Sequence, residues 1–410
     1  TRRSAWSILW ARHLPFPPDT GPTIMAERYS AQEMLARLVS FPTVSARSNL
    51  DLIEFVESYL AGHGIASIRV PDATGAKAAL HAVVGPHVDN GVVLSAHTDV
   101  VPVEGQAWSS DPFTLREADG RLYGRGTCDM KGFAALMLAA VPHMAAAPLT
   151  RPVHLALSYD EELGCLGAPP MIDNMLSDGP RPAMAVIGEP SSMQVITAHK
   201  GTALLQVSVR GHSVHSSQWD RGVSAIANAA RIIAWLDDRT RENRERADPG
   251  LVMDPPFTTL HCGVIEGGTA ANIMARSCKF VVDVRTVPGE TRQMWQARLE
   301  EFVRDTIEPS MRQIHADTGV SIECIADSPA LAEETDGPAE GLARRLTGDN
   351  GRHMVVYGTE AGQFQERGIS SVVCGPGSID QAHQPDEFIE IAQLAAGERF
   401  VSRLISDLSR

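Results

Sequence analysis

The sequence predicts an α/β protein in which a mixed sheet with helices on both faces carries an inserted ferredoxin-like βαββαβ domain. Three observations lead to this prediction. The chain has 410 residues, more than a single hydrophobic core usually accommodates, so two domains are expected. Short apolar runs alternate with helical patterns as far as residue 199. After that residue the order of the expected elements changes.

The alternating part of the chain is typical of a sheet covered by helices. Apolar runs with the length and composition of buried strands lie at residues 79–84, 92–96, 153–158 and 183–187. Helical patterns separate them at residues 50–63 and 133–146. The alternation resumes near residue 328, with expected helices at 341–346 and 391–408 and expected strands at 354–357 and 371–374.

The middle segment follows a different order. Expected strands lie at residues 204–209, 259–265, 279–284 and 320–325, and expected helices at 223–236 and 294–314. This βαββαβ order is that of the ferredoxin-like unit. We therefore expect one domain formed by residues 25–199 and 328–410, and a compact inserted domain formed by residues 200–327.

The first 24 residues differ in composition from the rest. They carry Trp6, Trp10 and a proline-rich run at residues 15–18, and Met25 follows them. A helical pattern begins only at residue 31. We expect Met25 to be the natural start and residues 1–24 to be a poorly ordered, non-native extension. A signal peptide is the alternative, but the segment lacks a continuous apolar core and a cleavage site of small residues.

Charge, hydropathy and cysteine usage argue against several classes of protein. Acidic residues outnumber basic ones by 50 to 36, and no lysine or arginine run could follow a phosphate backbone, so we expect no nucleic acid partner. The longest apolar stretch, residues 134–147, is too short to cross a membrane. The six cysteines are scattered without a C-x-x-C pair, which is typical of reduced thiols in a cytosolic protein.

Histidines and carboxylates follow several of the expected strands. Since an open α/β sheet binds ligands at the carboxyl ends of its strands, we expect these side chains to converge. Two imidazoles with several carboxylates suit two divalent metals of the zinc class. The clusters are His97 to Asp99, Asp129, Asp160 to Glu162, and Glu189, with His383 after the last strand.

Each member of this set also has a purely structural interpretation. His97 could be a hydrogen-bonded core histidine, and Asp129 could cap the helix that follows it. Glu161 and Glu162 could belong to a solvated loop, Glu189 could simply end a strand, and Asp160 could be a surface acid. Their common position after strands favours a metal site, because structural acids would be scattered over both ends of a sheet.

The motifs that contain these residues resemble those of the dinuclear zinc aminoacylase and carboxypeptidase family over nearly all of residues 25–410. They are Ser95-Ala96-His97-Thr98-Asp99, Gly124-Arg125-Gly126-x-x-Asp129-Met130-Lys131-Gly132, Asp160-Glu161-Glu162-x-Gly164 and Gly188-Glu189-Pro190. The acetylornithine deacetylase branch is the most similar, through residues 198–201, 358–362 and 375–383. Ser191 and Gln384 differ from the residues that are usual at these positions of the family's motifs, and neither is an expected ligand.

The resemblance implies a role for each residue. Asp129 bridges two metal ions, Zn²⁺ or Co²⁺; His97 and Glu189 complete one site, and Glu162 and His383 complete the other. Glu161 is the general base for attack of a metal-activated hydroxide on an amide, and Asp99 orients His97. The expected reaction is the deacylation of an N-acyl amino acid. The first candidate substrate is N-acetylornithine, whose deacetylation is a step of arginine biosynthesis.

The inserted domain and the last part of the chain supply further expected residues. In the related family the histidine corresponding to His215 reaches the active site of a partner subunit, so the resemblance implies a homodimer through a lid domain. Asn272 and Arg285 match substrate-contacting positions, and Arg285 could bind an α-carboxylate through two parallel hydrogen bonds. Glu360 is expected to select a basic side chain. His215 and Arg285 could equally be a loop histidine and a surface charge.

Other functions remain open at this stage. A succinyl-diaminopimelate desuccinylase, a general aminoacylase or a dipeptidase would use the same metal ligands. A metal-free binding or scaffold protein on this fold would be expected to have lost the base or the bridging residue, and both Asp129 and Glu161 are present. A serine hydrolase is disfavoured because no Gly-x-Ser-x-Gly motif occurs, and the Gly124-x-Gly126 motif lacks the third glycine of a dinucleotide site.

Overall fold

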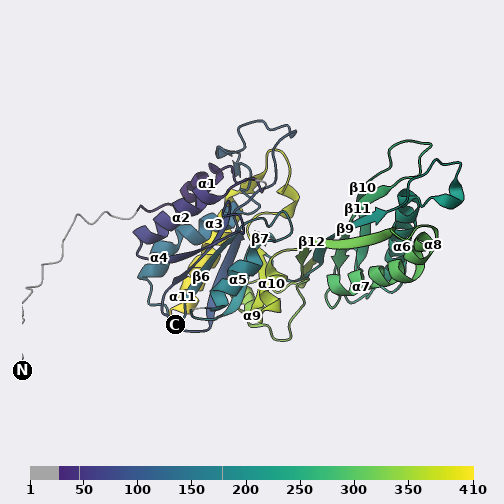
Figure 1. Cartoon of the computed structure of the whole chain (residues 1–410). Helices are drawn as coiled ribbons and strands as arrows, with labels where there is room; N and C mark the ends of the chain where they lie inside the picture. Colours follow the sequence, from purple (N-terminus) through teal and green to yellow (C-terminus); the bar gives the residue numbers. More distant parts are fainter. Residues whose placement is uncertain (1–26, 46, 178) are drawn as a thin grey trace, which may run out of the picture.

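The computed structural model describes residues 27–45, 47–177 and 179–410. The extension expected at residues 1–24 lies outside this part of the chain. The described chain forms two lobes that meet at one side (Figure 1). The larger lobe contains both ends of the described sequence, and the smaller one is formed by its middle.

The larger lobe is built on an eight-stranded mixed sheet in the order β1-β2-β6-β3-β7-β14-β8-β13. The four central strands β6, β3, β7 and β14 are parallel. The pairs β1–β2, β2–β6 and β14–β8 are antiparallel. The strands are β1 (Ser67–Pro71), β2 (Ala78–Val84), β3 (Gly91–His97), β6 (Val153–Ser158), β7 (Pro182–Pro190), β8 (Ile196–His199), β13 (His353–Val355) and β14 (Ser370–Gly375).

Helices cover both faces of this sheet because successive side chains of its strands point to opposite faces. In β3, Val92 and Leu94 pack into one core and Val93 packs into the other. The first core is closed by α1 (Ala31–Val39), α2 (Leu50–Gly62), α3 (Lys131–Ala139), α4 (Val141–Ala146), α9 (Pro338–Thr347) and α11 (Ile391–Leu408). The second is closed by α5 (Ala168–Ser177) and α10 (Ala361–Glu366).

A small three-stranded sheet joins two distant parts of the chain. Its order is β15-β5-β4, and its strands are β4 (Arg116–Ala118), β5 (Arg121–Tyr123) and β15 (Phe388–Glu390). The antiparallel pairing of β15 with β5 brings the segment before β15 next to the loop that follows β5. Three-residue strands carry too little periodicity to be read from sequence, and this sheet was not predicted.

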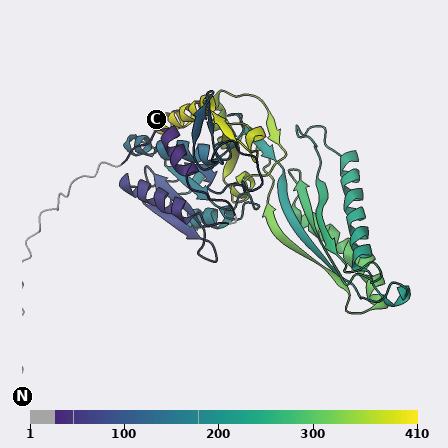
Figure 2. The ribbon, with the colours of Figure 1, turned by 90° about the horizontal axis from the view of Figure 1, so that it is seen from above.

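The smaller lobe is a four-stranded antiparallel sheet in the order β10-β11-β9-β12. Ala203, Leu205, Val207 and Val209 alternate along β9 and are buried under the helices. Figure 2 shows these helices together on one face of the sheet. The elements are β9 (Gly201–Arg210), α6 (Ala225–Glu245), β10 (Thr259–Gly267), β11 (Ser277–Thr286), α7 (Arg292–Phe302), α8 (Glu308–Ile314) and β12 (Gly319–Ser328).

This arrangement confirms the predicted fold class, a helix-covered mixed sheet with an inserted βαββαβ unit. The long helix expected at 294–314 is divided into α7 and α8 by a π-helical turn at Val303–Ile307. Short 3-10 turns at Trp219–Arg221 and Ile379–Gln381 complete the elements. No helix among the described residues is both long and apolar enough to cross a bilayer.

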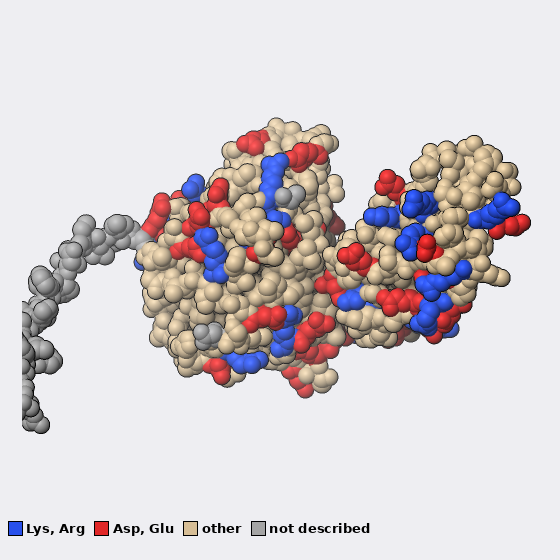
Figure 3. Space-filling view, in the orientation of Figure 1, with Lys and Arg blue, Asp and Glu red and all other residues tan. Residues whose placement is uncertain are grey.

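The surface carries charges of both signs. On the face shown in Figure 3, acidic and basic side chains are interspersed over both lobes, and a notch separates the lobes. The six cysteines are all unpaired thiols.

Candidate metal centre

Three neighbouring parallel strands bring functional side chains to one edge of the large sheet. β3 lies between β6 and β7, and all three run in the same direction. His97 is the last residue of β3, Glu189 lies at the end of β7, and residues 160–162 follow β6. The carboxyl ends of these strands therefore meet, as the sequence predicted for ligands of an open α/β sheet.

Asp129 reaches this edge from the loop before α3. The loop is drawn in because α3 packs directly on β7: a Cβ at Gly188 would lie 2.0 Å from the ring of Phe133. Only glycine permits so close an approach. The first turn of α3 is thereby pressed against β7, and Asp129, two residues before the helix, lines the same cavity as Glu189.

The Asp129 carboxylate lies between two imidazoles. Its Oδ1 is 2.9 Å from Nε2 of His97, and its Oδ2 is 3.3 Å from Nε2 of His383. A single carboxylate that presents one oxygen to each histidine has the geometry of a bridge. Asp129 and His97 are buried, whereas the side chain of His383 is half exposed.

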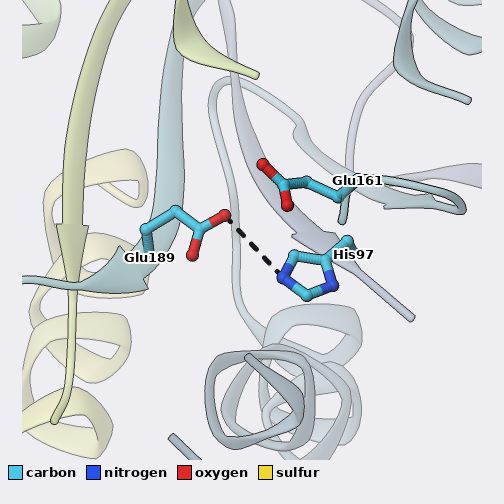
Figure 4. Close-up of side chains that lie close together, drawn as sticks. All are labelled: His97, Glu161 and Glu189. Carbon is cyan, nitrogen blue, oxygen red and sulfur yellow. Dashed lines mark ion pairs between the residues drawn. The ribbon is translucent and has the colours of Figure 1, made fainter. Parts of the chain in front are cut away.

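The remaining expected ligands surround this pair. An oxygen of Glu162 lies 3.0 Å from His383 Nε2, and Glu189 Oε1 lies 3.8 Å from His97 Nε2. Figure 4 shows the carboxylates of Glu161 and Glu189 and the ring of His97 facing one space. Among the described residues, two overlapping groups offer ligand atoms within 4.8 Å of one another: His97 with Glu161 and Glu189, and His97 with Asp129 and Glu162.

Asp99 organises the loop that carries the two glutamates. Its carboxylate accepts hydrogen bonds from the backbone N–H groups of Glu161 (3.2 Å) and Glu162 (3.4 Å), and from the Ser45 hydroxyl at 2.8 Å. Nδ1 of His97 donates to the backbone oxygen of Asp99 at 2.9 Å, while the Asp99 carboxylate lies 3.6 Å from that nitrogen. Asp99 therefore fixes the orientation of His97 mainly through its main chain.

Buried carboxylates outnumber the cationic side chains at this edge of the sheet. Burial and the nearby Asp129 carboxylate raise the pKa of both Glu162 and Glu189 above the usual range of a glutamate. Burial alone would lower the pKa of His97, but hydrogen bonds with Asp129 and Asp99 outweigh it and raise that pKa. Buried carboxylates in such excess need positive charge nearby. Two divalent cations would supply it, and the set of imidazole and carboxylate donors fits them.

A second layer of contacts holds the backbone of the Asp129 loop. Glu387 is buried, and its Oε1 accepts from the backbone N–H groups of Cys128 (2.9 Å) and Asp129 (3.1 Å). Its Oε2 accepts from the Gly126 N–H at 2.9 Å and from Nη1 of Arg125 at 2.8 Å. One carboxylate thus holds the whole turn before Asp129. Glu387 was not predicted from the sequence, where its only signal is its position four residues after His383.

A cavity of about 280 Å³ opens beside the expected ligands. Arg285 of β11 lines it, and its Nη1 donates to the Thr202 hydroxyl at 2.9 Å. Tyr357 lines it as well, with its hydroxyl 3.3 Å from the Pro190 carbonyl. The structure therefore brings Arg285 together with the expected ligands, although it belongs to the inserted lobe.

Three expected residues lie elsewhere. Glu360 is buried beside Ser95, whose hydroxyl donates to its Oε2 at 3.2 Å, and it does not line the cavity. His215 and Asn272 lie together in the inserted lobe, where the Ser216 N–H donates to the Asn272 carbonyl at 2.9 Å. Neither of these two residues lines the cavity of its own chain.

Three residues at or beside this centre have a left-handed backbone conformation. Asp160, Cys165 and His383 have φ angles of 53°, 58° and 64°, in the left-handed region that disfavours residues other than glycine. Asp160 is held by Lys77 at 2.5 Å. Strained residues persist where the surrounding contacts fix them, and they are common at functional sites.

Comparison with known sequences gives a consistent result. The sequence profile described as peptidase family M20/M25/M40 matches residues 93–407. A protein of Myxococcus xanthus named acetylornithine deacetylase is 35% identical over 384 residues, which cover 91% of this chain and 96% of that protein. A protein of the same name from Proteus mirabilis is 35% identical over 385 residues, covering 92% and 96% of the two chains.

Solved structures share the fold at much lower identity. A metallo-carboxypeptidase of the M20 family from Sulfolobus solfataricus superposes with a TM-score of 0.72 at 16% identity, covering 93% of this chain and 99% of that one. A dinuclear metal-binding peptidase of the M20 family from Bacillus subtilis gives a TM-score of 0.62 at 16% identity, covering 92% and 97%. At this identity the likeness concerns the fold alone.

Replacement of Glu387 by glutamine tests the support of the Asp129 loop. An amide nitrogen cannot accept a hydrogen bond, so one side of the turn loses its acceptor. We expect the affinity for Zn²⁺ to fall by about 10- to 100-fold, the range typical of residues that orient metal ligands. Titration of the metal-free protein with Zn²⁺ measures this. Glu390→Gln, at an exposed position of β15, is the matched control; equal affinities for both variants would contradict the role given to Glu387.

Proposed function

The chain belongs to peptidase family M20/M25/M40, and on this basis we propose that it removes the acyl group from an N-acyl amino acid, with N-acetylornithine as the first candidate. It is a metal-dependent amidohydrolase. The acetylornithine deacetylases that are 35% identical over most of the chain support the finer proposal. The observation that carries it is the Asp129 carboxylate between His97 and His383, with Glu161 directly beside this pair.

We propose Zn²⁺ or Co²⁺ as the ions, held by the five residues His97, Asp129, Glu162, Glu189 and His383. Bound there, the ions would polarise the amide carbonyl and lower the pKa of a water molecule. Asp129 would face both ions and screen their mutual repulsion. The backbone oxygen of Asp99 keeps the proton of His97 on Nδ1, which leaves Nε2 free as a ligand.

Glu161 is proposed as the general base. Burial raises the pKa of its carboxylate above the usual range of a glutamate, and a raised pKa favours a carboxylate that both accepts and releases a proton near neutral pH. Its Oε1 accepts a hydrogen bond from the Cys165 thiol at 3.2 Å. The carboxylate would take a proton from the attacking water and deliver it to the leaving amine nitrogen.

Substrate contacts come from the inserted lobe. We propose that Arg285 binds the α-carboxylate of the amino acid, because its guanidinium lines the cavity and is held there by Thr202 and Asp283. Asn272 is proposed as a further substrate contact. His215 is proposed to stabilise the developing oxyanion, and since it does not line the cavity of its own chain, it would do so in a partner subunit.

The inserted lobe offers a surface for this dimer. β10 lies at one edge of its sheet and leaves a row of backbone groups unpaired within the chain. Val264 and Ile265 on this strand are 65% and 52% exposed. Ile226 at the start of α6 and Ile273 are also exposed. We propose that two copies associate through this strand and the adjoining helix, with residues 200–327 as the dimerisation domain.

The basic side chain of ornithine would be recognised through Glu360. This carboxylate is buried, and its Oε1 has no hydrogen-bond partner among the described residues. Where water is excluded, the charge of a buried carboxylate attracts a cation over several ångströms. A desuccinylase, a general aminoacylase or a dipeptidase would use the same metal ligands. The substrate is therefore identified by comparing the rates of hydrolysis of several candidate substrates in one assay.

Glu161→Gln tests the assignment of the base. The amide cannot accept a proton, so we expect kcat for N-acetylornithine to fall by about 1,000-fold or more, while the protein still binds two equivalents of Zn²⁺. Steady-state kinetics with metal analysis of the same sample measure both quantities. Removal of the ions with a chelator and their return serves as the control. A variant that keeps its metal and turns over at the native rate would refute the role.

Glu360→Gln tests substrate choice. Loss of the buried negative charge should lower kcat/KM for N-acetylornithine by about tenfold or more and leave that for N-acetylmethionine nearly unchanged. The measurement is a substrate panel that includes N-succinyl-diaminopimelate, with the metal held constant. An unchanged ratio between the basic and the neutral substrate would exclude Glu360 as the selecting residue.

Val264→Lys tests the dimer. A charged side chain on the edge strand should oppose strand pairing between copies, so we expect a monomer with little activity, because His215 would no longer reach a partner. Light scattering and kinetics at the same concentration measure this. Ile68→Lys, at an exposed position on an edge strand of the larger lobe, is the control. A native chain that is monomeric and fully active would rule out the proposal.

A further inference from the structure

The loop between β6 and α5 carries the proposed general base on a long and flexible side chain. Glu161 lies in this loop, and Figure 4 shows its carboxylate facing the space shared by His97 and Glu189. A glutamate side chain has many rotamers, and holding it in one of them costs conformational entropy. Because a base must lie within hydrogen-bond reach of the proton that it abstracts, the carboxylate needs a contact that fixes its direction.

The Cys165 thiol supplies that contact. Its sulfur lies 3.2 Å from Glu161 Oε1. Burial raises the pKa of the thiol, so the sulfur keeps its proton and is the donor. Within the described part of the chain, no other group donates a hydrogen bond to the Glu161 carboxylate. The Cys165 N–H also donates to the Glu161 carbonyl at 2.8 Å, so two hydrogen bonds join the same two residues.

The backbone of Cys165 is itself held by both lobes. Its carbonyl accepts a hydrogen bond from Nε2 of the buried Gln363 of α10 at 3.1 Å. The preceding residue, Gly164, packs against the end of β12, where a Cβ at Gly164 would lie 2.6 Å from the Cβ of Ala326. The φ angle of Gly164 is 106°, which also favours glycine. A residue fixed in this way can hold the side chain that it contacts in one direction.

Cys165 lies beside the base and apart from the expected metal ligands. Both Cys165 and Glu161 line the cavity next to those ligands. Among the residues that the structure describes, the two groups whose ligand atoms lie within 4.8 Å of one another do not include Cys165. The position of the thiol therefore suits a contact with the base better than the coordination of an ion.

We infer that Cys165 is a positioning residue, whose thiol holds the Glu161 carboxylate in the direction from which it takes up and returns the proton. The inference rests on the proposed function, because Glu161 acts as a base only if the chain hydrolyses an amide. Loss of the thiol would free the carboxylate to turn away and leave the metal ligands in place. A displacement of about 1 Å can slow a reaction by about 100-fold, and the loss should fall on kcat.

Steady-state kinetics of the full zinc-loaded chain test the inference, with the N-acyl amino acid that the native chain hydrolyses fastest. Cys165→Ala has no donor, so we expect kcat to fall by about tenfold or more while KM and the zinc content stay native. Cys165→Ser keeps a donor and should restore kcat to within about threefold of the native value. Cys278→Ala, which truncates a buried cysteine in the core of the inserted lobe, is the matched control and should keep the native kcat.

A double substitution separates positioning from a structural effect. In a Glu161→Gln chain the base is already lost, so adding Cys165→Ala should lower the residual kcat by less than about twofold. A structural defect would lower kcat by the same factor in both chains. The inference is overturned if Cys165→Ala has the native kcat, if Cys165→Ser is as slow as Cys165→Ala, or if the two losses multiply. A native chain that hydrolyses no N-acyl amino acid would instead refute the proposed function, and the inference with it.

Discussion

The larger lobe is organised around the need to hold Asp129 between His97 and His383. This carboxylate lies in a buried region that already contains Glu161, Glu162 and Glu189, so its position is unfavourable unless positive charge and hydrogen bonds surround it. The backbone N–H of Asp129 is bound by Glu387, and its loop is pressed inward by the contact of α3 with Gly188. Strand order, helix packing and the small sheet at β15 all serve to bring these groups to one edge.

Parts of this arrangement could be predicted from the sequence because they depend on local order. His97 and Glu189 lie at the ends of clearly apolar strands and residues 160–162 follow another. Parallel strands necessarily place their carboxyl ends at one edge. The strands of the insert are likewise visible in the sequence, because buried and partly exposed residues alternate along them, as they do in β9. His383 was placed in the cluster because it follows the last expected strand, and its role as a ligand came from the family resemblance.

The supporting contacts could not be predicted in this way. Arg125 and Glu387 form a buried ion pair across 262 residues of sequence, and they meet only because three-residue strands pair in the small sheet. Cys165, Thr202 and Tyr357 line the cavity beside the expected metal ligands from three separate segments. They meet only because the two lobes pack against each other. No pattern within a single segment of the sequence indicates that packing.

The attachment of the inserted lobe has a mechanical consequence. It joins the rest of the molecule through β9 and β12, which are hydrogen-bonded to each other from Thr202 and Ser328 outward. A ten-residue strand at roughly 3.3 Å per residue extends about 33 Å, and His215 lies beyond its far end. A small pivot at the base of this two-stranded stem would barely displace Arg285 but would carry His215 through a wide arc. The stem thus acts as a lever, with Arg285 near its fulcrum and His215 at its tip.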